Sequence, residues 1–222
     1  KVVFDIGGGV PNGKKFKAVQ IGGPSGGCLP EHELDNALDY DSLQKVGAMI
    51  GSGGIVVMDE DNCIVEVAKF FMSFIQAESC GKCVACREGT KQMLHIITKI
   101  VEDKATLEDL ELLEEIASVV KDASLCALGK TAANPILSTL RYFRDEYLAH
   151  IVDHECPSGV CAAFKKYTII PEKCVGCSAC SKKCPTNAIS GVVKNPFVID
   201  TNLCIRCDTC VETCRFDAIE VR

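Results

Sequence analysis

The run CVGCSACSKKCPTNAI, residues 174–189, returns thirty residues later as CIRCDTCVETCRFDAI, residues 204–219. Each run places four cysteines in the spacing C-x2-C-x2-C-x3-C. Three thiolates this close together can surround one face of a metal-sulfur group from a single loop, whereas the fourth lies on the segment that follows. The duplication predicts a module of two matching halves over residues 166–222.

This spacing is typical of bacterial ferredoxins with two 4Fe-4S clusters, in which the fourth cysteine of each run ligates the other cluster. We therefore expect ligation to cross between the repeats, and a zinc ribbon is disfavoured. The two predicted ligand sets are Cys174, Cys177, Cys180 and Cys214 for one cluster, and Cys204, Cys207, Cys210 and Cys184 for the other.

The composition narrows the class of protein. Sixteen cysteines, most of them in C-x-x-C runs, favour cluster ligation in a reducing cytoplasm over a disulfide scaffold. The net charge of −6 without a basic block argues against nucleic-acid binding, and no stretch of about 18 apolar residues predicts a membrane span. The chain lacks an initiating Met and begins in a strand-like segment, so we expect an upstream portion.

The preceding residues predict two further domains in an α+β chain. Residues 1–57 alternate short apolar runs with glycine clusters, which favours a small sheet whose glycines lie in turns rather than in a phosphate-binding loop. Residues 58–150 show apolar stripes with the helical period in four segments, which predicts a four-helix bundle with Phe70, Phe71 and Phe74 in its core.

A third cysteine run lies in the predicted bundle. The stretch ESCGKCVACREGT, residues 78–90, supplies Cys80, Cys83 and Cys86 but no nearby fourth cysteine. A helical hairpin over about residues 87–121 would bring Cys126 back toward this loop, so Cys126 is the best candidate for the fourth ligand of a 4Fe-4S cluster. A zinc site and a three-iron cluster remain alternatives.

The last group is the linker at residues 151–165, which contains HECPSGVC. Three clusters use twelve cysteines and leave Cys28, Cys63, Cys156 and Cys161. We predict that His154, Cys156, Cys161 and Cys63 bind one structural zinc, since Cys63 opens the first bundle helix and the linker follows the last. Such a site would fasten the carboxy-terminal module to the bundle as the base of a hinge. An unliganded thiol pair and a fourth iron-sulfur cluster are the alternatives, and Cys28 is interpreted as a buried structural thiol.

Several longer motifs carry a resemblance. GGPSGGCLP, GSGGIVVMDED, ESCGKCVACREGT, SLCALGK and STLRYFRDEY resemble the flavin-bearing, NADH-oxidising subunit of respiratory complex I and its soluble relatives. With the linker and the carboxy-terminal module, the order is similar to the beta subunits of trimeric electron-bifurcating or NAD(P)-linked iron-only hydrogenases. The resemblance implies a β-grasp-like first domain and a four-helix domain whose cluster, held by Cys80, Cys83, Cys86 and Cys126, lies beside FMN.

The nucleotide and flavin domain of that family has no match in this sequence, so FMN and NAD(P) are expected only in the missing upstream domain. The chain is interpreted as the electron-relay portion of an oxidoreductase that is catalytic only as part of a complex. The expected partners are a hydrogenase catalytic subunit, a small thioredoxin-like 2Fe-2S subunit and a soluble ferredoxin. The alternatives are an NAD-linked formate dehydrogenase subunit, a stand-alone polyferredoxin and a cluster-dependent sensing module.

Overall fold

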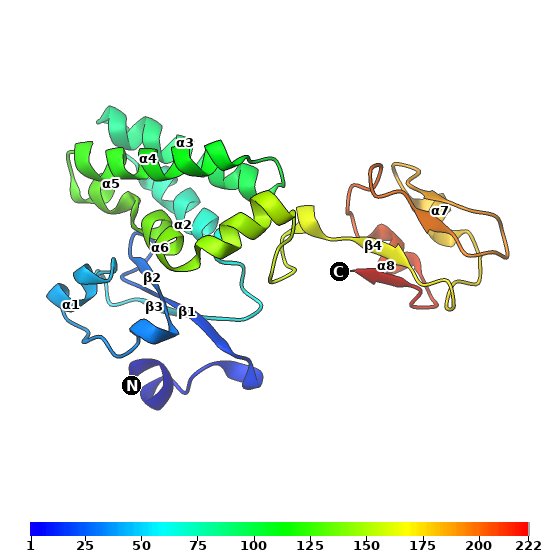
Figure 1. Ribbon diagram of the computed structural model, residues 1–222, viewed down its shortest axis with the longest axis horizontal. Helices are drawn as coiled ribbons and strands as arrows, with labels where there is room; N and C mark the ends of the chain where they lie inside the picture. The colour runs from blue at the N-terminus through cyan, green and yellow to red at the C-terminus, as the bar shows by residue number, and fades with distance from the viewer. Residues whose placement is uncertain (222) are drawn as a thin grey trace. The chain divides into compact units, whose positions relative to one another are not determined.

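Three antiparallel strands form the sheet of the amino-terminal part. In this computed structural model, which describes residues 1–221, the order is β2 (Gly27–Pro30), β1 (Phe16–Ile21) and β3 (Ile55–Asp59) (Figure 1). The central residue Val19 pairs with Leu29 on one side and Val57 on the other. The expected small sheet is therefore present in this segment, together with several short helical segments, whereas the β-grasp assignment stays a prediction.

Short helical segments and tight turns complete this part. They are η1 (Val2–Ile6), η2 (Pro11–Gly13), η3 (Glu31–Glu33) and α1 (Tyr40–Lys45). Gly22 has φ of +94°, and a Cβ there would lie 2.3 Å from the carbonyl oxygen of Met49. Only glycine fits this close approach, which agrees with the interpretation of these glycines as turn residues.

The helical segment contains five helices rather than the expected four. They are α2 (Ile64–Glu78), α3 (Val84–Val101), α4 (Leu107–Ala123), α5 (Ala127–Ala132) and α6 (Asn134–Leu148) (Figure 1). The additional helix is α5, a short segment whose N-cap is Cys126. Thr106 and Asp109 form a reciprocal capping box at the start of α4.

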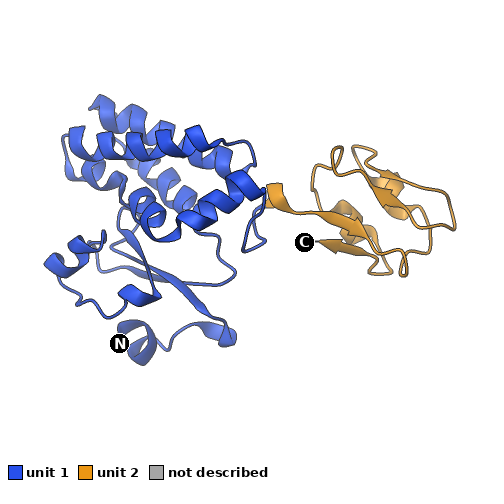
Figure 2. Ribbon diagram, viewed as in Figure 1, with its two compact units in different colours: residues 1–161 blue, residues 162–222 orange. Residues whose placement is uncertain are grey.

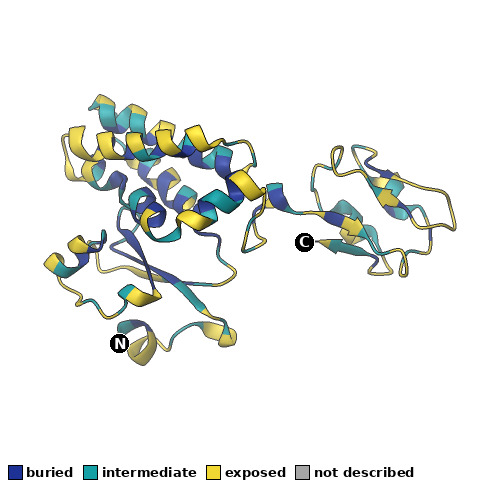
Figure 3. Ribbon diagram, in the orientation of Figure 1, coloured by how far each residue is buried: buried dark blue, intermediate teal, exposed yellow. Residues whose placement is uncertain are grey.

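The core of the bundle is made from one face of each long helix (Figure 3). Met72, Met93, Ile97 and Leu113 are fully buried. The prediction for the phenylalanines is only partly right, because Phe71 is buried whereas Phe70 and Phe74 are 66% and 50% exposed. These two side chains point away from the core because positions 70 and 74 are one turn apart on the outer face of α2.

Hydrogen bonds with residues of α6 join the amino-terminal part to the bundle. The backbone N–H of Cys28 donates to Ser138 Oγ at 2.9 Å, and Asn134 Nδ2 donates to the carbonyl oxygen of Ser25 at 3.0 Å. Sheet and bundle accordingly belong to one compact unit, Lys1–Cys161, and a second unit begins at Ala162 (Figure 2). The unit boundary lies inside the predicted linker 151–165.

The second unit repeats a strand-helix-strand pattern. Its elements are η5 (Ala162–Phe164), β4 (Tyr167–Ile169), α7 (Ala179–Lys183), β5 (Ile189–Ser190), β6 (Val198–Ile199), α8 (Thr209–Thr213) and β7 (Ile219–Val221). β4 pairs with β7 and β5 with β6, both antiparallel.

Across residues 1–221, every helix is too short or too polar to cross a membrane.

Candidate metal centres

Two cavities in the second unit are lined by the cysteines of the duplicated runs. The walls of one cavity include Cys204, Cys207, Cys210 and Cys184, and those of the other include Cys174, Cys177, Cys180 and Cys214. Each cavity therefore takes three thiols from one run and the fourth from the other run. These are the two crossed sets that the spacing predicts.

Matching backbone turns position the thiols of the two runs. Ser178 and Asp208 both have left-handed conformations, with φ of 62° and 60°, and each begins a five-residue helix. The turn directs the chain from the first two cysteines of a run into the helix that carries the third, Cys180 in α7 and Cys210 in α8. Cys184 and Cys214 end these helices.

The surroundings of the sulfur atoms fit anionic ligands. The backbone N–H of Ala218 donates to Cys214 Sγ at 3.4 Å, and Thr209 Oγ1 lies 3.3 Å from Cys207 Sγ. Hydrogen bonds from the hydroxyl and the N–H of Thr209 lower the pKa of Cys207. Burial and the neighbouring Cys204 raise the pKa of Cys210 to about 11. Crowded thiols cannot all ionise unless a cation compensates, and iron in a 4Fe-4S cluster supplies that compensation.

Two of the bundle cysteines, Cys83 and Cys86, lie where α5 and the loop before it approach α3. Backbone N–H groups of Leu125 and Cys86 lower the pKa of Cys83, so the Cys83 thiol lies beside the loop that leads to Cys126. A Cβ on Gly129 of α5 would lie 3.2 Å from the Cβ of Cys86. Ser79 Oγ is 3.3 Å from Cys86 Sγ, and Cys80 and Cys126 are exposed. The donor set of thiols and N–H groups fits a 4Fe-4S cluster at one end of the bundle.

A fourth group of ligands is buried at the other end of α2. One ligand atom from each of Cys63, His150, Cys156 and Cys161 lies within 4.8 Å of the other three. Cys63 Sγ is 3.4 Å from His150 Nε2. Because four ligands at zinc distances are about 3 to 4 Å apart at the corners of a tetrahedron, the spacing fits one zinc ion.

The histidine in this group is His150, which corrects the prediction of His154. α6 continues into a wide turn, η4 (Ala149–Asp153), on whose inner side His150 is buried. His154 follows with φ of 53° and ends the helical segment. Its Nδ1 lies 2.6 Å from Asp103 Oδ1, and its side chain is 64% exposed. The sequence pattern favours the histidine nearest the cysteines along the chain, whereas the helical face determines which histidine points inward.

A hydrogen bond fixes the tautomer of His150. Its Nδ1 lies 2.7 Å from the carbonyl oxygen of Glu146, which can only accept, so Nδ1 carries the proton and Nε2 is left as the ligand atom. Burial lowers the pKa of His150, but contacts with Cys156 and Cys63 outweigh burial and raise it to about 10. Cys161 and Cys63 lower the pKa of Cys156, and Cys156 in turn raises that of Cys161. Without metal, the thiols and the imidazole of this group therefore share protons, and zinc binding would release them.

An ion pair between β1 and α6 lies next to these four ligands. Lys17 Nζ on β1 lies 2.7 Å from a carboxylate oxygen of Glu146, whose other oxygen accepts the N–H of Ile64 at the start of α2. Lys17 Nζ also donates to Ser158 Oγ at 2.8 Å and to the carbonyl oxygen of Asn62. The linker is therefore fastened to β1, α2 and α6 at the same place.

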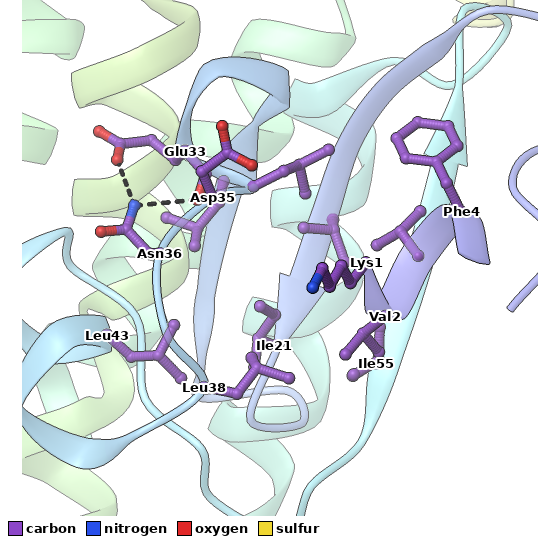
Figure 4. A pocket seen from close by; sticks show the side chains of 14 residues that line it. Lys1, Val2, Phe4, Ile21, Glu33, Asp35, Asn36, Leu38, Leu43 and Ile55 are labelled. Atoms are coloured by element: carbon purple, nitrogen blue, oxygen red, sulfur yellow. Dashed lines mark hydrogen bonds between the residues drawn. The ribbon is translucent and has the colours of Figure 1, made fainter. Parts of the chain in front are cut away.

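The remaining cysteine and a further cavity have no metal-ligand set. Cys28 is buried in β2, as expected, and burial raises its pKa to about 12. A cavity of about 330 Å³ in the sheet region is lined mainly by apolar residues of η1, β1 and the η3–α1 segment, and its lining includes Lys1, Glu33 and Asp35 (Figure 4). No cysteine or histidine lines this cavity within the described chain.

Comparisons with known families agree with the motifs. Residues 66–150 match the NADH-ubiquinone oxidoreductase-F iron-sulfur binding region, and residues 167–190 and 197–220 match the 4Fe-4S binding domain. The chain therefore contains 4Fe-4S binding domains in both units. The resemblance to the family of NADH-oxidising subunits is confirmed.

The similar proteins are components of redox complexes. The chain is 52% identical over 219 residues to the NADP-reducing hydrogenase subunit HndC of Solidesulfovibrio fructosivorans, covering 99% of this chain and 45% of the relative. It is 40% identical over 157 residues to an NADH-quinone oxidoreductase subunit of Rhizobium meliloti, covering 71% of this chain and 37% of the relative. An NAD+-reducing [NiFe]-hydrogenase crystal structure matches with a TM-score of 0.57 and 32% identity, covering 62% of this chain and 24% of that one. This chain thus spans less than half the length of these proteins.

Proposed function

We propose that this chain is the iron-sulfur relay portion of an NAD(P)H-linked, flavin-dependent oxidoreductase subunit of the hydrogenase type. The observation that carries the proposal is the pair of cavities lined by crossed sets of four cysteines, next to a third cysteine set in a region of the NADH-oxidising family. Bound 4Fe-4S clusters would supply one-electron transfer. The similarity to an NADP-reducing hydrogenase subunit over 99% of the chain favours hydrogenase over formate dehydrogenase.

The proposed ligands follow the three cysteine sets. Cys80, Cys83, Cys86 and Cys126 would hold the cluster that receives electrons from FMN in an upstream domain. The two crossed sets of the second unit would hold the clusters from which electrons leave toward a ferredoxin or a hydrogenase subunit. N–H groups directed at sulfur, such as that of Ala218 toward Cys214, stabilise the reduced, more negative state of a cluster.

The fourth group is proposed to hold a structural zinc. Cys63, His150, Cys156 and Cys161 form a closed set of four ligands with no open position, which is characteristic of structural rather than catalytic zinc. Three of these residues lie within twelve positions of the unit boundary at Cys161. Zinc would therefore anchor the start of the second unit, in the role of hinge base that the sequence suggests.

The rival functions differ in what they require. A stand-alone polyferredoxin would not need the region that matches the NADH-oxidising subunits, and a sensing module would not need three cluster sets in one chain. The proposed setting is a cytoplasmic hetero-oligomer with a hydrogenase catalytic subunit and a thioredoxin-like 2Fe-2S subunit. Electron bifurcation belongs to the same proposal.

Metal and sulfide analysis of the anaerobically purified full-length protein tests the ligand scheme. We expect about twelve irons and twelve sulfides per chain, together with one zinc. About eight irons would remove the bundle cluster from the scheme. Bound iron without labile sulfide would contradict the relay altogether.

A further inference from the structure

The two units differ in the balance of their charged side chains. Residues 162–222 contain nine Lys and Arg against six Asp and Glu, whereas residues 1–161 contain fifteen against twenty-four. The second unit therefore has an excess of basic side chains in a chain whose total charge is −6. Charge of one sign on a small electron-transfer unit attracts partners of the opposite sign and orients them on approach.

Part of this basic charge lies beside one of the two cysteine-lined cavities. A separate cavity of about 250 Å³ is lined by Lys165, Lys166, Tyr167, Thr201, Asn202, Cys204 and Arg206. Cys204 also lines the cysteine cavity of Cys204, Cys207, Cys210 and Cys184. Three cationic side chains thus lie around an opening that reaches a proposed cluster ligand.

The internal repeat shows that the arginine of this cavity is specific to the second of the two cluster loops. Arg206 occupies the position of Gly176 in the first run, and both are left-handed, with φ of 58° and 67°. A side chain at Gly176 would meet the backbone of Asn195 at 2.5 Å, whereas Arg206 extends to Lys165 and donates from Nε to its carbonyl oxygen at 3.2 Å. A left-handed backbone strains arginine but not glycine, so the second run has a cation where the fold itself favours glycine.

Apolar side chains lie in the same loop. Leu203 and Ile205 are 53% and 61% exposed, and Cys207 is exposed. Asp208 offsets part of the positive charge, since it accepts a hydrogen bond from the Tyr167 hydroxyl and lies 3.8 Å from Lys165 Nζ. The result is a small apolar centre beside a cluster loop with Lys166 and Arg206 next to it, which is the pattern of a transient protein interface.

We propose that Lys165, Lys166, Leu203, Ile205 and Arg206 form the docking surface for an acidic electron-carrier protein of the soluble ferredoxin class. This inference rests on the proposed relay and specifies its exit as the cluster held by Cys204, Cys207, Cys210 and Cys184. One electron passes from the reduced cluster to the oxidised carrier, with no bond or proton transferred. A carboxylate of the carrier would enter the basic cavity while its apolar surface covers Leu203 and Ile205.

The test compares two pairs of charge-removing substitutions in the complete complex. Lys166→Gln with Arg206→Gly removes two charges from the docking surface, and the glycine reproduces the first run. Lys182→Gln with Lys183→Gln is the matched control, because these exposed lysines lie on α7 and outside the cavity lining. The probe is an oxidised acidic two-cluster ferredoxin, and its Kd is measured by calorimetry at low and moderate salt.

We expect the first pair to weaken binding about tenfold at low salt and to flatten the salt dependence, whereas the control pair leaves both close to wild type. Iron content and reduction of a small dye should not change in either variant. An unchanged Kd in the first pair, an equal loss in the control pair, or displacement of the carrier by inorganic phosphate at constant ionic strength would each overturn the docking surface. If wild type binds the carrier but NADH never reduces it, the relay fails while the docking surface stands.

Discussion

Replacing His150 by alanine should release zinc without affecting iron. The imidazole is fully buried, its Nδ1 is committed to the Glu146 carbonyl oxygen, and its Nε2 lies among three thiols. Structural zinc sites bind with an apparent free energy of about 10–16 kcal/mol, so an even share for one of four ligands is about 3 kcal/mol. The affinity for zinc should therefore fall roughly 100-fold.

His154→Ala is the matched control, because this histidine is exposed and bonded only to Asp103 among the contacts the structure gives it. Competition with a chromogenic chelator measures zinc affinity, and iron analysis of the same samples reports the clusters. His150→Cys keeps four soft ligands and should retain zinc. If His154→Ala lost zinc while His150→Ala retained it, His150 would not be the ligand. The inference that the buried face of the helix selects the histidine would then be wrong.

Three other outcomes follow from the same structure. Cys126→Ala should lower the iron content by about four atoms and leave the crossed clusters intact, because the ligand sets lie in different units; loss of about eight irons in iron analysis would contradict this. Removing zinc with a chelator should make the segment from His150 to Cys161 sensitive to protease, since metal binding is coupled to local folding, and an unchanged digestion pattern would exclude an anchoring role. Asp109→Ala should destabilise the first unit by about 1 kcal/mol in denaturant unfolding. Glu108→Gln, next to it in the same turn, is the control and should leave the free energy of unfolding close to wild type. The hydrogen bond from Lys99 lowers the pKa of Asp109, so its contribution is present above the ordinary value of 3.8 and is lost as the pH falls through the lower folded value.

Short sequence patterns predict much of this architecture. The crossed cysteine sets could be predicted because the cysteines of each run are closely spaced and the run is repeated. The geometry of each loop therefore follows from its own residues. The capping box at Thr106 and Asp109 is also a local feature. Within each cysteine run and in the capping box, the residues that decide the local structure lie within a few positions of one another, and the duplication itself indicates the crossing.

The predictions that differ from the structure concern positions whose burial depends on tertiary packing. Phe70 and Phe74 belong to an apolar helix, but α2 is covered on only one side within the described chain, so the outer positions are exposed. His150 could have been found from the buried positions of α6, since Ile136, Leu140 and Tyr147 continue to it with helical spacing. α5 was missed because six residues are too few to show a period.

The most direct test of the relay follows electrons through the complete complex. NADH is mixed anaerobically with the oxidised enzyme, samples are frozen at increasing times, and paramagnetic resonance records the reduced clusters. The account predicts that signals lost in Cys126→Ala appear first and that those of the crossed clusters follow at a rate no slower than turnover. Clusters of this chain that stay oxidised while the complex turns over would contradict it.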